Sequence, residues 1–298
     1  YTRQLWVFEG ITSYYDDLGL LRGGLVDTGE YLRLLGQTLS SVYQSRGRRR
    51  QTLEDSSFDA WTKFYKRDEN FPNAVVSYYS KGAMVALALD LELRLRSKGR
   101  CSLDDVMVAL WQRCGLEEGR SIAEGGFEQF VEEFSGLDLG EFFRQSVRNT
   151  VDPPVGILLA QFGIRLHLRP RESAADTGGT PGQREARPRA WLGITTRVVA
   201  ERIEIASVLA DGPARSAGLA AGDELIAIDG FRVDRDHFDS CLDALETERP
   251  VAIHVFRQGL LREVEVLPAR PPRDVCYLTL ESSADEATLA RRRAWLGD

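Results

Sequence analysis

The sequence is poor in cysteine and contains no CxxC pair, no long apolar run and no basic half. Its four cysteines are too few for a disulfide scaffold and are wrongly spaced for a zinc knuckle. No run of 18 uninterrupted apolar residues exists, so no membrane-spanning helix is predicted. The net charge of −7 is spread over both halves, which argues against a nucleic-acid partner. The sparse cysteines favour a reducing compartment, and we expect the protein in the cytoplasm.

The first residues also lack an initial Met and the basic, apolar and small-residue regions of a signal peptide. Tyr1 leads directly into a helix-like apolar stretch. We therefore expect a truncated fragment whose targeting information has been lost. The composition, 43% hydrophobic and 28% charged, is that of an ordinary globular protein. Its 298 residues are enough for two or three domains.

Helical periodicity dominates residues 1–152. The longest predicted helix covers about 77–97 and is apolar nearly all round in its first half, which predicts a buried position. Ser102 and Asp105 have the spacing of a capping box at the start of the next helix. Further helices are predicted at about 28–45, opened by Thr28, and by the apolar patterns of residues 127–134 and 139–147.

Residues 153–189 break this pattern. They contain an alternating strand-like segment near Ile164, and the polar, Gly/Pro-rich residues 171–188 predict a flexible linker. Short strands, glycine turns and one helix then occupy 190–270, followed by a tail (271–298) with a predicted strand and helix. The predicted fold class is therefore multidomain α plus β, an all-α helical subdomain followed by a β-rich domain.

Five short motifs follow one another in the β-rich region: WLGI (191–194), GPA (212–214), AGL (217–219), GDELI (222–226) and IDG (228–230). In this order, with a predicted helix and two closing strands after them, they resemble the PDZ domain, especially the bacterial kind attached to proteases. The resemblance implies a module that binds peptides or the C-termini of proteins.

A PDZ domain holds a peptide's terminal carboxylate in a nest of backbone N–H groups and adds the peptide as an extra strand. Gly193 supplies the residue without a Cβ that such a turn needs, and by the resemblance Leu192 and Ile194 flank the pocket for the last side chain. His237, at the start of the helix, is a candidate contact for a ligand hydroxyl or else an ordinary surface histidine. The alternative for the whole loop is a plain turn in a domain that serves as a spacer.

Glu9 and Gly10 are the unusual pair of the first predicted helix. Glu9 lies beside the apolar face, four residues after Leu5, where an ionised group needs a partner. Gly10 is in the middle of the helix, which costs about 1 kcal/mol relative to alanine. The carboxylate beside the apolar face is explained if Glu9 binds a metal. The glycine in the helix is explained if Gly10 allows another backbone segment to pack closely against it. The alternative is a Glu9 held in a salt bridge.

Residues 6–15 (WVFEGITSYY) resemble the third-ligand helix of gluzincins, the thermolysin-like zinc peptidases in which an HExxH helix supplies two histidines and a later helix a glutamate. Together with 56–61 (SSFDAW), 76–83 (VSYYSKGA) and a PDZ-like domain after the helices, nearly the whole chain is similar to the glycyl aminopeptidases. This resemblance implies a zinc metallopeptidase that removes small N-terminal residues from peptides.

By the same resemblance, Glu9 is the third zinc ligand. Tyr79, two residues before Lys81-Gly82, is then the tyrosine whose phenol stabilises the tetrahedral intermediate. Three protein ligands leave zinc one position for water, and the metal acidifies that water and polarises the scissile carbonyl. A phenol O–H at the developing oxyanion favours the transition state over the ground state. A core tyrosine is the alternative for Tyr79.

The sequence departs from the family at the HExxH motif. Its only histidines are His167, His237 and His254, and none lies in that motif. Two zinc ligands and the general-base glutamate are thus not in this chain, and one carboxylate cannot hold zinc against water. We predict zinc in the full-length parent but none in this fragment, which should be inactive as a peptidase.

Three functions are compared. The first is the C-terminal part of an aminopeptidase with its PDZ module, and the second is a non-catalytic PDZ adaptor on a helical scaffold. An upstream HExxH in the reading frame would favour the first. A trypsin-like stress protease also carries PDZ modules, but no Gly-Asp-Ser-Gly motif occurs here. A cut before Tyr1 should expose apolar surface, so we expect self-association through the first helix and the region near Tyr78 and Tyr79.

Overall fold

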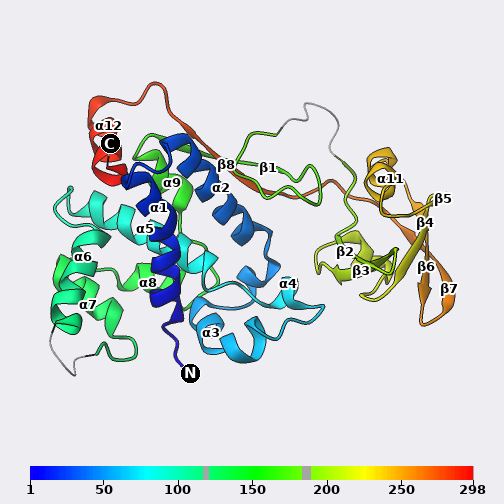
Figure 1. Cartoon of the computed structure of the whole chain (residues 1–298), viewed down its shortest axis with the longest axis horizontal. Helices are drawn as coiled ribbons and strands as arrows, with labels where there is room; N and C mark the ends of the chain where they lie inside the picture. Colours follow the sequence, from blue (N-terminus) through cyan, green and yellow to red (C-terminus); the bar gives the residue numbers. More distant parts are fainter. Residues whose placement is uncertain (117–120, 183–188, 298) are drawn as a thin grey trace.

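A computed structural model of the chain describes residues 1–116, 121–182 and 189–297. A helical body and a smaller sheet domain lie side by side along the long axis of the molecule (Figure 1). The fold class predicted from the sequence is confirmed, because helices dominate the first part and an antiparallel sheet the second. None of the described helices combines the length and the apolar character that a membrane crossing needs.

The helical body contains one deeply buried helix with other helices packed around it. In chain order they are η1 (Trp6–Gly10), α1 (Ile11–Arg22), α2 (Thr28–Gln44), η2 (Arg46–Arg49), α3 (Leu53–Phe58), η3 (Ala60–Phe64), α4 (Phe71–Ala74), α5 (Ser80–Arg96), α6 (Leu103–Leu110), η4 (Trp111–Gly115), α7 (Gly126–Ser135), α8 (Gly140–Ser146), α9 (Val155–Ala160) and α12 (Glu286–Leu296).

α5 is the central helix of the body. Every residue from Lys81 to Leu91 is buried, because η1, α1, α2 and α9 pack around it. The apolar run of the sequence predicted this burial, although the helix begins at Ser80 rather than near residue 77. The Ser102–Asp105 capping box at the start of α6 is also confirmed. At α2 the cap is Asp27, whose carboxylate accepts from the Glu30 amide, rather than Thr28.

A two-stranded sheet joins the last part of the chain to the body. β1 (Ile164–Pro170) pairs antiparallel with β8 (Arg273–Leu280), and β8 packs against α2. The tail (271–298) therefore returns to the helical body, and the sheet domain is an insertion between two paired strands. Sequence periodicity could not reveal this, because strand pairing over more than 100 residues leaves no local pattern.

The segment predicted as a flexible linker is partly packed. Arg169 forms a bidentate ion pair with Asp176 at 2.6 and 3.0 Å, and the Gly179 amide donates to the Cys276 carbonyl. A Cβ on Gly179 would lie 2.3 Å from the Arg33 carbonyl oxygen of α2, so only glycine fits this contact. Residues 171–182 thus form a loop fixed against α2, while residues 183–188 lie outside the described part of the chain.

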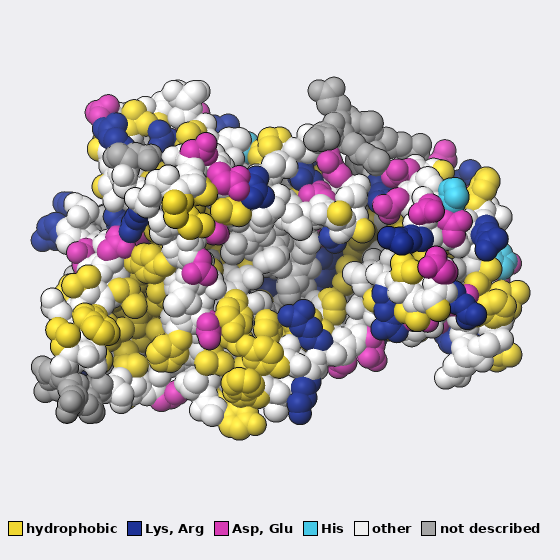
Figure 2. All heavy atoms as spheres, viewed as in Figure 1, with side chains coloured by type: hydrophobic (Ala, Val, Ile, Leu, Met, Phe, Trp, Pro, Cys, Tyr) yellow, Lys and Arg dark blue, Asp and Glu magenta, His cyan; other side chains and the backbone are white. Residues whose placement is uncertain are grey.

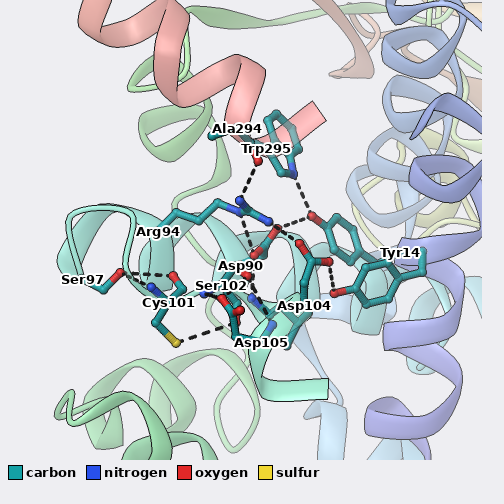
Figure 3. A network of polar contacts seen from close by, with 12 residues as sticks. Tyr14, Asp90, Arg94, Ser97, Cys101, Ser102, Asp104, Asp105, Ala294 and Trp295 are labelled. Atoms are coloured by element: carbon teal, nitrogen blue, oxygen red, sulfur yellow. Dashed lines mark hydrogen bonds and ion pairs between the residues drawn. The ribbon is translucent and has the colours of Figure 1, made fainter. Parts of the chain in front are cut away.

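A buried polar network fastens the C-terminal helix to the body (Figure 3). Asp90 of α5 accepts from the Tyr14 hydroxyl at 2.7 Å and from the Leu103 amide at 2.8 Å, and it pairs with Arg94. The Trp295 indole N–H donates to the Tyr14 hydroxyl at 2.8 Å. Burial, reinforced by Asp90, raises the pKa of Tyr14 well above its usual value, so the phenol stays neutral. The network is structural, since these groups satisfy one another.

The sheet domain is a strongly bent antiparallel sheet with two short helices and its own core. Its strand order is β2-β3-β4-β6-β7, and β5 pairs with β4. The strands are β2 (Ile194–Val199), β3 (Arg202–Val208), β4 (Glu224–Ile228), β5 (Phe231–Arg232), β6 (Val251–Arg257) and β7 (Leu260–Val266), with helices α10 (Pro213–Ala217) and α11 (Phe238–Ala244).

Candidate functional site

Two glycines bring η1 directly against α5. A Cβ on Gly10 would lie 2.6 Å from the Cα and the carbonyl carbon of Gly82, and a Cβ on Gly82 would lie 2.8 Å from the Cα of Gly10. Cβ atoms essentially never approach backbone that closely, so both positions require glycine. The close approach expected from Gly10 is thus present. Because Glu9 directly precedes Gly10, this contact places Glu9 near the start of α5, where Tyr79 lies.

The Glu9 carboxylate is half-buried and has no counter-charge among the described residues. The Thr12 hydroxyl bonds only to the backbone carbonyl of Glu9, at 3.0 Å, and leaves the side chain unengaged. A salt-bridged Glu9, the alternative from the sequence, is therefore absent from this part of the structure. A partly buried carboxylate without a partner is available to an incoming cation or to an N–H donor.

Tyr79 is the residue just before α5, and its phenol is half-buried in a cluster of aromatic rings. Its ring lies 4.5 Å from that of Tyr78 and 5.9 Å from that of Phe64, and its hydroxyl is 3.0 Å from the hydroxyl of Tyr65. The hydrogen bond with Tyr65, burial and the negative charge of Glu9 raise the pKa of Tyr79, against an opposing contribution from Tyr78. The phenol therefore keeps its proton at neutral pH and can donate it.

Sequence reasoning did not identify Tyr65. It follows η3, is about half exposed (51%), and belongs to no apolar period. Only the fold shows that the Tyr65 hydroxyl contacts the hydroxyls of Tyr78 and Tyr79, which lie 13 and 14 positions later in the sequence.

Lys81, within the same sequence motif as Tyr79, is directed elsewhere. Its Nζ lies 3.4 Å from the Arg48 carbonyl oxygen and 3.9 Å from Asp152, which also pairs with Arg48. Burial, with a smaller contribution from Arg48, lowers the pKa of Lys81 to about 8. The lysine thus anchors α5 to η2 and is not the counter-charge of Glu9.

The described residues contain no group of three or more His, Cys, Asp or Glu side chains able to hold a metal ion. His167 stacks on Tyr277 and bonds to Thr279 within the β1–β8 sheet, and His254 pairs with Glu263 in the sheet domain. Glu9 fits one carboxylate position of a three-ligand zinc site. The described chain offers no second or third ligand beside it, so these residues alone do not build a zinc site.

Exposed aromatic side chains occur on the elements next to the Glu9–Tyr79 pair, and one of them, Tyr65, contacts Tyr79. Apolar side chains gather on this face near the N-terminus and α3 (Figure 2). Tyr1 packs on Phe58 at 5.5 Å, and Trp61 stacks on Tyr65 at 5.1 Å. An apolar surface of this kind, with a carboxylate and a phenol in it, is suited to contact with a substrate or with further protein. Its most exposed rings are Tyr1, Phe8, Phe58, Trp61 and Tyr65.

The loop before β2 turns at a glycine in the left-handed region. Gly193 has φ +75°, and a Cβ there would lie 2.5 Å from the Cα of Gly212, so no other residue fits without strain. The carbonyls of Leu192 and Gly193 accept from the amides of Ala214 and Leu209. The amides of Leu192 and Gly193 donate to no other described group. Two adjacent free N–H groups are what a carboxylate needs.

β2 is an edge strand of the sheet, so its outer side can pair with an added strand. Ile194, its first residue, is half-buried, whereas Leu192 is only 2% exposed and packs into the domain core. Of these two predicted pocket residues, only Ile194 leaves appreciable side-chain surface. Arg189 ties this region to α11 by its 2.6 Å ion pair with Asp239.

His237 caps α11 and is largely exposed, with its ring 2.7 Å from the Asp234 carboxylate. The pKa of Asp234 is lowered chiefly by this hydrogen bond. The ring nevertheless stays on the surface of the helix start, where either of the two roles predicted for it remains open.

The helical body contacts the sheet domain beside this loop. Arg46 pairs with Asp211 of the sheet domain at 2.9 Å and with Asp274 of the body at 3.0 Å, and its guanidinium lies over the Trp191 ring. The Asn73 side chain donates to the Val208 carbonyl and accepts from the Ala210 amide, each at 2.8 Å. Side chains from η2 and α4 thus hold the loop after β3, whose Gly212 packs against Gly193.

Comparison with known families identifies two regions. Residues 1–85 match the M61 glycyl aminopeptidase family, and residues 190–267 match the PDZ domain. The crystal structure of an aminopeptidase N family protein from Idiomarina loihiensis is similar to the chain, with 34% identity and a TM-score of 0.89. The match covers 99% of this chain but 49% of that protein, so this chain spans about half its length.

Solved structures of PDZ domains match a smaller part of this chain. The HtrA3 PDZ domain bound to a phage-derived ligand is 17% identical and covers 31% of this chain and 90% of its own (TM-score 0.25). The PDZ domain of a carboxy-terminal protease from Vibrio cholerae, in complex with a peptide, is 18% identical and covers 29% and 99% (TM-score 0.25). None of the curated proteins compared with the chain matched it.

Proposed function

Because the chain joins an M61 glycyl aminopeptidase region to a PDZ domain, we propose that it is the C-terminal part of a longer zinc-dependent aminopeptidase that removes small N-terminal residues from peptides. The PDZ domain binds peptide or protein C-termini in the same molecule. The 298 residues alone are inactive as a peptidase, because the described part of the chain holds no group of residues that could form a catalytic zinc site.

The observation that carries this proposal is the half-buried, unpaired Glu9 carboxylate beside the Tyr79 phenol. In the longer protein Glu9 serves as one zinc ligand, and zinc supplies a nucleophilic water and a polarised carbonyl when it is bound. Tyr79 donates a hydrogen bond to the oxyanion that develops on the substrate carbonyl. The Gly10–Gly82 contact keeps these two side chains on one face, and the exposed aromatic rings around them exclude water from a bound peptide.

The enzymatic proposal is tested on the longer protein that includes an HExxH helix. It should release N-terminal glycine or alanine from short peptides, and a chelator should lower the rate by about a hundredfold or more, because the metal supplies several kcal/mol of transition-state stabilisation. Peptides with an acetylated N-terminus should resist cleavage. Activity that survives complete removal of zinc, or a longer protein without activity, would refute the proposal.

The PDZ domain should bind a peptide with a free C-terminus at least about tenfold more tightly than the same peptide with a C-terminal amide. A charge-assisted hydrogen bond to the free amides of Leu192 and Gly193 contributes about 1.5–3 kcal/mol. Fluorescence polarisation on this chain measures the difference. Acetylation at the other end of the peptide is the control and should leave the affinity unchanged. Equal affinity for acid and amide would contradict a carboxylate site at Gly193.

A non-catalytic adaptor is the second candidate, and the sheet domain favours it, because that domain has a core and a binding loop of its own. If the longer protein hydrolyses nothing while this chain still binds C-terminal peptides, the adaptor function replaces the enzymatic one.

A further inference from the structure

Tyr65 joins two other tyrosines through a single hydroxyl. Its Oη lies 3.0 Å from the Oη of Tyr78 and 3.0 Å from the Oη of Tyr79. Tyr78 is buried at 1% exposure, while Tyr79 and Tyr65 reach the surface beside Glu9. The three phenols therefore run in sequence from the interior of the body to the face of the candidate site.

We propose that Tyr65 is a positioning residue, which donates a hydrogen bond to Tyr79 when Tyr79 donates its own proton to the substrate oxyanion. Tyr78 in turn donates to Tyr65. This inference rests on the proposed aminopeptidase function, and it assigns Tyr65 and Tyr78 a part in the reaction.

The direction of these hydrogen bonds follows from the number of protons that the three phenols can donate. Each phenol has one O–H to donate and two lone pairs with which to accept. When Tyr79 directs its proton at an oxyanion, it can accept from Tyr65 but can no longer donate to it. Tyr65 then donates its proton to Tyr79, so the bond that remains for it is one accepted from Tyr78. The direction from Tyr78 through Tyr65 to Tyr79 satisfies all three hydroxyls at once.

The direction also has a consequence for the strength of the last bond. Hydrogen bonds in a chain polarise one another, so a phenol that accepts one hydrogen bond becomes a better donor in the next. No proton is transferred between the tyrosines: the three hydroxyls only rotate, and every O–H bond stays intact. Tyr79 therefore donates to the oxyanion more strongly with Tyr65 in place than without it.

Aromatic packing keeps the Tyr65 hydroxyl at this point. Its ring stacks on Trp61 at 5.1 Å and meets the edge of Phe64 at 5.3 Å. Phe64 also packs on Tyr78 at 5.1 Å. A phenylalanine at position 65 preserves these ring contacts and removes only the hydroxyl, so Tyr65→Phe isolates the hydrogen bonds.

The first experiment measures peptide hydrolysis by the longer protein. Tyr65→Phe should lower kcat about three- to tenfold, the loss expected for one hydrogen bond, and change KM less than twofold. Tyr15→Phe is the control, because it also removes a partly buried phenol hydroxyl, one that bonds to Asp104 at 2.9 Å in a different part of the body. Its kcat should match that of the wild type. A kcat for Tyr65→Phe equal to that of the control would overturn the proposal.

A double-mutant comparison separates positioning from a general structural effect. In a Tyr79→Phe background, Tyr65→Phe should have no further effect on kcat, because Tyr65 acts only through Tyr79. Independent, multiplying losses in this pair would overturn the proposal.

A spectroscopic readout on this chain needs no catalysis. With tyrosine labelled at the ring Cζ carbon, the NMR resonance of Tyr79, assigned with Tyr79→Phe, should move in Tyr65→Phe and stay in place in Tyr15→Phe. An unmoved resonance would overturn the hydrogen-bonded chain whatever the enzyme does. If the resonance moves but the wild-type longer protein is inactive, the hydrogen bond between the tyrosines exists and the proposed aminopeptidase function is wrong. The positioning role of Tyr65 is then wrong as well.

Discussion

Glu9→Gln in the longer protein should lower kcat/KM about a thousandfold, because a neutral amide replaces the carboxylate that we propose as a zinc ligand. The estimate corresponds to about 4 kcal/mol of transition-state stabilisation, a typical contribution of a catalytic metal ion. Bound zinc per molecule should fall in parallel, as metal analysis after dialysis would measure. Glu69→Gln, a change at an exposed loop position, is the control and should keep both activity and zinc.

The same substitution distinguishes a functional carboxylate from a structural one. Glu9 has no partner among the described residues, so in this chain its replacement by glutamine removes a half-buried charge that nothing stabilises. The melting temperature of this chain with Glu9→Gln should therefore equal or exceed that of the unsubstituted chain, while in the longer protein the same change should abolish activity. A clear fall in melting temperature would instead support a structural salt bridge, and full activity would remove Glu9 from the site.

Gly10→Ala should lower the free energy of unfolding of the helical body by about 3 kcal/mol. Its Cβ would lie 2.6 Å from backbone atoms of Gly82, and the backbone of a buried helix cannot move aside as a side-chain end can. Urea unfolding of this chain, followed by far-ultraviolet circular dichroism, measures the change. Gly82→Ala should have a similar effect, because its Cβ meets Gly10 in the same way.

Gly19→Ala is the matched control for this prediction. It is also a glycine in the first helical stretch, but nothing lies within 4 Å of a Cβ there and the residue is exposed. Alanine at this position should stabilise the helix by about 0.5–1 kcal/mol through propensity alone. If Gly10→Ala behaved like Gly19→Ala, the close contact between η1 and α5 would be disproved.

Local sequence patterns were reliable wherever a physical requirement lay within a few residues. The capping box at Ser102 and the burial of α5 follow from hydrogen-bond spacing and from an apolar run, and both are confirmed. Gly10 was predicted to permit a close backbone approach, and the fold provides the partner in Gly82. The roles of Glu9, Tyr79, Gly193 and His237 in binding or catalysis stay predictions.

Other features escaped the sequence because they join residues that are far apart. Tyr65 meets Tyr78 and Tyr79 only after η3 and α5 have packed. The loop at 171–182 is polar and rich in glycine, as a free linker would be, yet Gly179 fits against α2 because a glycine also allows tight packing. Composition alone cannot distinguish a glycine that makes the backbone flexible from a glycine that allows two backbone segments to pack closely.

By itself, the sequence determined the two kinds of domain, their order and the residues in which chemistry is to be sought, because helical period, strand alternation and turn glycines act over a few residues. Only the tertiary structure decided that β1 and β8 enclose the sheet domain, that Arg46 and Asn73 hold the loop after β3, and that Tyr79, beside Glu9, is linked to Tyr65. These contacts depend on how separate elements pack, and packing sums many small interactions that no short segment contains.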